Sequence, residues 1–97
     1  MKLVFSDSAR NELESIGDWI ANESPTRAIS FVHELRQVCF EILAFPNSCP
    51  LVPRYETHGI RRKIYGNYLI FYCVAEEVVE VIHILHGAQD YESILFP

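Results

Sequence analysis

The chain has 97 residues, a formal net charge of −5 and a hydrophobic content of 49%, which together predict one globular domain. The excess of acidic residues excludes a protein that coats nucleic acid through its whole surface. No apolar run approaches the ~20 residues of a membrane span, and the apolar stretch after Lys2 is too short for a secretory signal. We therefore expect a cytoplasmic protein that makes no contact with membranes.

The first half of the chain predicts a strand followed by two helices. Residues 2–6 form the predicted strand, and residues 7–23 and 26–45 place apolar side chains at the spacing of amphipathic helices. Serine followed by proline at positions 24 and 25 is typical of a helix start, and the short connection predicts an antiparallel helix hairpin. The apolar stripes consist of Ala9, Leu13, Ile16 and Ile20, widened by Trp19, and of Ala28, Phe31, Leu35, Val38 and Ile42.

The second half predicts a three-stranded antiparallel meander. Residues 46–59 contain three of the five prolines and are expected to form a connecting loop. The apolar period then changes to that of strands, which we place at residues 60–65, 68–74 and 78–86. Turn residues separate them, with Gly66 and Asn67 typical of a two-residue hairpin and two glutamates forming the next turn.

These elements predict an α+β fold with two layers, in which the helix hairpin packs on the sheet. The strands at 68–74 and 78–86 are apolar on both faces, so each face needs a cover. The helix hairpin covers one face only. The loop and the tail at residues 88–97 cover the other face, or another chain does, and we interpret this face as a binding surface.

Three of the eight basic residues are consecutive, at Arg61, Arg62 and Lys63. Alternation along a strand places Arg61, Lys63 and Tyr65 on one face and Arg62 on the other. Two interpretations are open for this cluster. It forms part of a partner-binding surface, or it protects an edge strand from aggregation by its charge.

Histidines and aromatic residues provide further candidates. His83 and His86 point to opposite faces of their strand and cannot chelate one ion, so we expect a hydrogen-bonded core histidine at position 83. His86 lies near Asp90 and Tyr91 in the sequence and is a candidate acid–base group. The aromatic side chains Tyr65, Tyr68, Phe71 and Tyr72 form either a stacking platform for bases or part of the sheet core.

No metal site, cofactor site or disulfide framework is expected. The three cysteines are odd in number, and their spacing matches neither a zinc site nor a set of disulfide bridges. The chain also has no Gly-rich phosphate loop and no nucleophile elbow. We therefore expect reduced thiols and no cofactor.

The segment "SDSARNELESIGDWIANESPTRAISFVHEL", the hairpin "GIRRKIYGNYLIFYCV" and the strand end "VIHILHGAQDY" resemble the ParE branch of the RelE/ParE toxin family over nearly the whole chain. This resemblance implies the fold described above and the toxin role in a type II toxin–antitoxin module. It also implies a hetero-oligomer with a ParD-like antitoxin, through which the toxin reaches operator DNA only indirectly.

The resemblance leaves three functions open. ParE-like toxins inhibit DNA gyrase without being enzymes, whereas RelE-like toxins cleave mRNA on the ribosome and would use Arg61, Lys63, His86 and Tyr91 in catalysis. A third alternative is a non-toxic scaffold that only binds its antitoxin. Gln89 stands where many ParE-like sequences have arginine, which favours a binding role over catalysis. The expected partner-binding residues are Arg61, Arg62, Lys63, Tyr65, Tyr68, His86, Asp90 and Tyr91.

Overall fold

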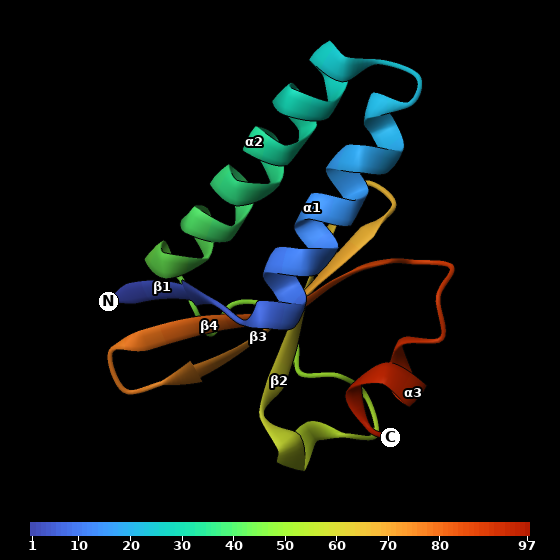
Figure 1. Cartoon of the computed structure of the whole chain (residues 1–97). Coiled ribbons are helices and arrows are strands. Elements are labelled where there is room, and N and C mark those ends of the chain that lie inside the picture. The colour runs from blue at the N-terminus through green and yellow to red at the C-terminus, as the bar shows by residue number, and fades with distance from the viewer.

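The computed structural model describes residues 1–97 and confirms the predicted α+β fold, with a helix hairpin on one side of a sheet (Figure 1). No helix combines the length and the apolar character that crossing a membrane requires. The elements in chain order are β1 (Lys2–Phe5), α1 (Asp7–Ala21), α2 (Pro25–Glu41), the 3₁₀ turns η1 (Ile42–Ala44) and η2 (Glu56–His58), β2 (Ile60–Tyr65), β3 (Tyr68–Ala75), β4 (Val78–His86) and α3 (Tyr91–Leu95).

Both long helices begin at serine caps. The hydroxyl of Ser6 accepts a hydrogen bond from the backbone N–H of Ala9, and Ser24 caps α2 in the same way with Pro25 at the first position. The ends fall earlier than predicted. The backbone N–H groups of residues 23 and 24 both bond to the carbonyl of Ile20, which closes α1 at Ala21, and α2 tightens into η1 after Glu41.

The four strands form one sheet in the order β1-β4-β3-β2. The predicted meander is antiparallel, and the hairpin turn places Tyr65 opposite Tyr68, with Gly66 at a φ of 58° that favours glycine. The first strand pairs in parallel with the last, for example Lys2 with Val78. Residue periodicity does not predict this pairing, because it joins the two ends of the chain.

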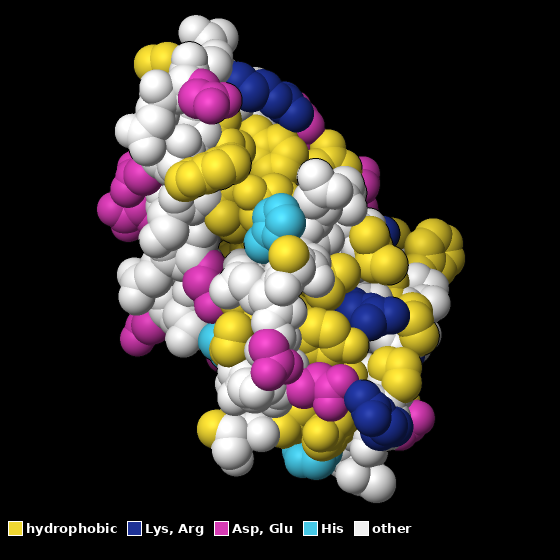
Figure 2. All heavy atoms as spheres, turned by 90° about the vertical axis from the view of Figure 1, so that its right-hand side faces the viewer, with side chains coloured by type: hydrophobic (Ala, Val, Ile, Leu, Met, Phe, Trp, Pro, Cys, Tyr) yellow, Lys and Arg dark blue, Asp and Glu magenta, His cyan; other side chains and the backbone are white.

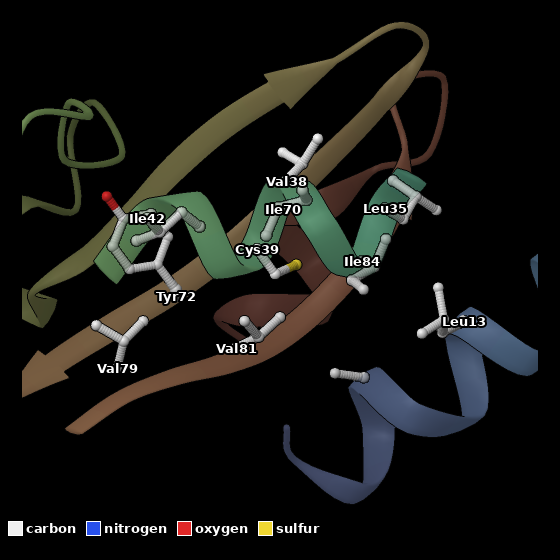
Figure 3. Close-up of a cluster of buried hydrophobic side chains, with 11 residues drawn as sticks. Leu13, Leu35, Val38, Cys39, Ile42, Ile70, Tyr72, Val79, Val81 and Ile84 are labelled. Carbon is white, nitrogen blue, oxygen red and sulfur yellow. The ribbon is translucent and has the colours of Figure 1, made fainter. Parts of the chain in front are cut away.

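The larger core lies between the helix hairpin and the sheet, and we call this the helix-side face (Figure 3). Side chains of α2 such as Leu35 and Cys39 point toward β3 and β4, while α1 contributes Leu13 from the side (Figure 3). Burial raises the pKa of the Cys39 thiol to about 12, so this thiol stays protonated and acts as a small apolar group. The cluster contains 11 buried residues.

The opposite face of the sheet, here called the tail-side face, is covered by the chain itself. Its five buried residues are Val52, Ile60, Leu69, Phe71 and Leu85. The loop at 46–59 wraps around β2, and α3 with the residues after it packs beside the loop against this cluster. Of the two covers that the sequence predicts for this face, the loop and the tail are confirmed, and the interpretation as an exposed binding surface was wrong.

Candidate functional site

The three consecutive basic residues do not form one positive patch. Their predicted alternation is correct, but each guanidinium has a separate role. Arg61 lies on the helix side, where its Nη1 donates to the backbone carbonyls of Asn47, at 3.2 Å, and Cys49, at 2.7 Å. Arg62 lies on the tail side and donates to the hydroxyl of Tyr91 at 3.2 Å. A strand divides neighbouring side chains between two faces, and here it separates the charges as well.

His86, Asp90 and Tyr91 are adjacent in sequence but do not meet as an acid–base group. The Nδ1 of His86 accepts a hydrogen bond from the backbone N–H of Ala88, at 3.1 Å, within the turn that follows β4. The carboxylate of Asp90 accepts from the hydroxyl of Ser93, at 2.6 Å. Tyr91 instead packs on Phe71 of the tail-side face, with ring centroids 5.2 Å apart.

The four aromatic candidates belong to two environments, neither of which is a row of exposed rings. Phe71 and Tyr72 are fully buried, each on a different face of the sheet. Tyr65 and Tyr68 are half-buried and pack against Phe31 of α2, with ring centroids 6.1 and 5.4 Å apart. The core interpretation is therefore correct for the buried pair, and the other pair joins the β2–β3 hairpin to α2.

A charged cluster centred on Glu34 fixes that hairpin to α2. The hydroxyl of Tyr65 donates to the carboxylate at 2.8 Å, and Arg27 donates to the same carboxylate at 2.5 Å. These bonds, that from Arg27 foremost, hold the pKa of Glu34 below its usual value, and donation to the carboxylate raises the pKa of Tyr65. The cluster is exposed, so solvent screens it and its role is orientation of the hairpin tip.

Beside this hairpin lies an apolar groove of about 520 Å³, and we call it the α1 groove. Figure 2 shows hydrophobic side chains around a hollow in the upper half of the view, with a histidine at its lower border and acidic side chains along one side. One wall is α1, the floor is the start of β3 and the end of β4, and the other wall is the tail. The lining residues are Asn11, Glu12, Ser15, Ile16, Trp19, Tyr68, Ile84, Leu85, His86, Gln89 and Ile94.

The carboxylate of Glu12 sets the position of α1 beside the groove. It accepts a hydrogen bond from the backbone N–H of Ile84, at 2.9 Å, and contacts Nδ1 of His83, at 2.8 Å. The predicted hydrogen bond of His83 is confirmed, although its partner comes from a helix far away in the sequence, and the side chain is half-buried rather than part of the core. Because both contacts join α1 to β4, they hold the wall of the groove against its floor.

Trp19 is the residue that sequence reasoning assigned wrongly. We placed it at the margin of the buried stripe of α1, yet its exposed fraction is 70%. Its ring lies on the α1 wall with Ile16, outside the contact between the two helices, where Gly17 approaches Val32. The sequence feature that could have indicated its exposure is its position at the margin of the apolar stripe. A large exposed aromatic residue in a groove is a frequent energetic centre of protein interfaces.

The α1 groove is mainly apolar. Its lining includes one carboxylate, that of Glu12, and no lysine or arginine. No group of three histidine, cysteine, aspartate or glutamate side chains is placed to hold a metal ion. The arrangement is suited to an apolar protein segment that also carries basic side chains.

Comparison with known proteins connects this geometry to a family. The sequence model of a family described as "ParE toxin of type II toxin-antitoxin system, parDE" matches residues 3–91. The chain belongs to the ParE toxin family. Its structure is similar to that of a solved chain described as "Chromosomal ParDE TA system from P. aeruginosa", with a TM-score of 0.75 and 18% identity over 89% of this chain and 95% of that chain. No curated protein matches the chain significantly.

The match to the ParE toxin family covers most of the α1 groove but little of the tail. The match includes α1 and the end of β4, so the main wall and the floor of the α1 groove lie in the family region. It ends at Tyr91, and Glu92 and the residues after it lie beyond the match. Most of the groove lining therefore lies within the residues that match the family.

Proposed function

We propose that this ParE-family chain inhibits DNA gyrase by protein–protein binding, without catalysis, and that a ParD-like antitoxin neutralises it by occupying the α1 groove. Family membership makes the chain a toxin component of a type II system. The observation that supports the antitoxin site is the α1 groove itself, an apolar surface that includes the exposed Trp19. Grooves of this kind accept amphipathic helices.

The dispersed candidate residues support a binding role over mRNA cleavage. In-line attack by a 2′-hydroxyl needs a base, an acid and cations within hydrogen-bonding reach of one phosphate. Arg61 is bonded to the loop on the helix side, whereas Tyr91 lies on the tail side of the sheet. The ring nitrogen Nδ1 of His86 is used within its own turn. These groups stand apart, and the endonuclease alternative would need them together.

The proposed antitoxin segment is helical and carries basic side chains. The lining of α1 runs from Asn11 to Trp19, about 12 Å at the helical rise, which matches roughly two turns of a partner helix. Apolar side chains of that helix would pack on Ile16 and Trp19, and a lysine or arginine would face Glu12. Opposite charge at the border of an apolar groove fixes orientation and speeds association.

The target is tested with purified gyrase and by labelling in cells. We expect the purified chain to inhibit DNA supercoiling by gyrase and to leave cleaved DNA, and the antitoxin to restore supercoiling. In bacteria that express the chain alone, DNA synthesis should fall before protein synthesis. Protein synthesis falling first, with gyrase unaffected, would support the mRNA endonuclease instead. Unaffected synthesis of both, with antitoxin binding retained, would support the non-toxic scaffold.

The antitoxin site is tested by comparing two exposed apolar residues. Trp19→Ala should weaken antitoxin binding about 30-fold, since a central aromatic residue contributes 2 kcal/mol or more. Ile29→Ala is the matched control, because Ile29 is 76% exposed on the outer side of α2 and does not line the groove. Equal affinities for the two variants, both folded, would place the antitoxin elsewhere.

A further inference from the structure

The tail is held to the tail-side face by a few side chains. Its helix, α3, has five residues, none of them fully buried, and is too short to be stable by itself. The carboxylate of Glu92 accepts a hydrogen bond from Arg54 at 2.7 Å. The ring of Phe96 stacks on Tyr55, with centroids 3.9 Å apart, and meets the edge of His58 at 4.7 Å.

These contacts are of the kind that open easily. The side chain of Arg54 is 76% exposed, so water and salt screen its pairing with Glu92. In the lower half of Figure 2, basic and acidic side chains meet at the surface beside hydrophobic ones. The tail joins β4 through a turn at residues 87–90 that lies outside the sheet. Release of the tail therefore leaves the four strands and both long helices in place.

Beneath the tail lies a cation without a matching anion. Arg62 donates through Nη1 to the neutral hydroxyl of Tyr91, and its Nε is buried with no hydrogen-bond partner. No carboxylate lies within ion-pair distance of its guanidinium, although the chain is acidic overall. A guanidinium that is partly removed from water is best satisfied by a carboxylate, which accepts two parallel hydrogen bonds. The site is built for a more negative occupant than the tail.

We propose that residues 91–97 are a releasable strap, and that the surface beneath them binds a protein segment with acidic and aromatic side chains. Such a segment would stack an aromatic ring on Tyr55, pair one carboxylate with Arg54 and place a second carboxylate on Arg62. The tail itself meets the first two requirements, with Phe96 and Glu92, and meets the third only with the Tyr91 hydroxyl. The site lies on the tail-side face and shares one border with the α1 groove, because Ile94 of the strap also lines that groove. It does not depend on the identity of the toxin's target.

Release of the strap is measured by amide hydrogen exchange on the full chain. The N–H of Phe96, bonded to the carbonyl of Glu92, should exchange at least tenfold faster than the amides of β3. Arg54→Glu should accelerate it further, and the charge-swapped pair Arg54→Glu with Glu92→Lys should restore the original rate. Tail and β3 amides exchanging at one common rate would overturn the proposal, because the tail would then open only when the whole domain unfolds.

Binding is measured with a labelled peptide of residues 90–97 added to full-length Phe96→Ala protein, in which the strap is weakened and the site is intact. The peptide should bind this variant about fivefold more tightly than the wild-type chain, whose own tail competes. A second peptide carries 4-carboxyphenylalanine at position 91, which keeps the ring and replaces the hydroxyl with a carboxylate. It should bind at least fivefold more tightly than the first.

The gain from the added carboxylate must depend on Arg62. Introducing Arg62→Met into the Phe96→Ala protein retains the packing of the side chain and removes its charge, so both peptides should then bind with equal affinity. A folded Arg62→Met protein that still prefers the carboxylate peptide would overturn the assignment of the anion to Arg62. Equal binding of the first peptide to the Phe96→Ala and wild-type chains would overturn the strap.

Discussion

The two faces of the sheet are covered in different ways. The helix-side face packs against two helices of 15 and 17 residues, whose stripes bury a cluster of 11 residues. The tail-side face packs against an irregular loop and a five-residue helix, with a buried cluster of five. Stability on the first face is shared among many apolar contacts, whereas on the second face it depends on a few identifiable side chains. The two long helices therefore cover the helix-side face permanently, whereas the few side-chain contacts of the tail allow its release from the tail-side face.

The largest expected effect is loss of a large side chain from the helix-side face. Leu35→Ala should lower the free energy of unfolding by about 3 kcal/mol, because Leu35 is fully buried between α2 and the sheet. On the tail side, Phe96→Ala should cost about 1 kcal/mol, the contribution of a partly exposed aromatic pair. Urea unfolding of both variants measures the difference. Equal losses of unfolding free energy in the two variants would mean that both faces are held by contacts of similar strength, which would contradict the contrast between the two covers.

The next effect concerns Glu12, whose carboxylate joins α1 to β4. Glu12→Ala leaves the N–H of Ile84 without its acceptor, and we expect a loss of about 2 kcal/mol in the free energy of unfolding. Glu14→Ala, on the exposed side of the same helix, is the control and should change it by less than about 0.5 kcal/mol. If both changes cost the same, the position of α1 is fixed by apolar packing alone.

Substitution of Arg61 measures how much its hydrogen bonds contribute to holding the loop at residues 46–59 where it passes from the helix side to the tail side of the sheet. Its guanidinium holds the carbonyls at positions 47 and 49 on the helix side, just before the chain passes around β2 to Val52 on the tail side. We expect Arg61→Met to cost about 1 kcal/mol in thermal or urea unfolding. Lys63→Met removes a charge from the same strand and face, where no side-chain bond is made, and should be nearly neutral. A larger effect from Lys63 would contradict this assignment.

The smallest expected effect is that of the exposed cluster at the hairpin tip, and it depends on pH. Hydrogen bonds from Arg27 and Tyr65 lower the pKa of Glu34 from its ordinary value of 4.5. The carboxylate therefore adds stability above pH 4.5 and loses it as the pH falls through the lowered pKa. Glu34→Gln should be slightly less stable than wild type at pH 7, and the difference should shrink below pH 4.5. A difference independent of pH would exclude the charge as its source.

Local patterns predicted β1, the two long helices, the three strands of the meander and much of the core, but not α3 or the two 3₁₀ turns. The apolar stripe of α2 identified Leu35, Val38 and Ile42 correctly, since helical spacing alone decides which side chains share a face. Serine caps and the glycine turn also follow from the chemistry of single residues. What local pattern cannot supply is the partner of a side chain. His83 was expected to be hydrogen-bonded, but its partner lies 71 residues away.

The basic triplet illustrates the same limit at the site. Alternation predicted which face each side chain takes, and the structure agrees. The carbonyls that hold Arg61 and the tyrosine above Arg62 come from a loop and a tail, whose paths depend on long-range packing. The α1 groove was missed for a related reason, since it needs a helix, a strand end and the tail to be brought together.

The parallel pairing of β1 with β4 also affects how the protein is made. Because β1 is synthesised before β4 and pairs with it, the sheet cannot be completed until β4 has left the ribosome. Contacts between distant parts of a chain form late in folding. A chain broken off before β4 has neither a finished sheet nor the floor of the α1 groove. The groove therefore forms only in molecules that contain β4 as well as α1.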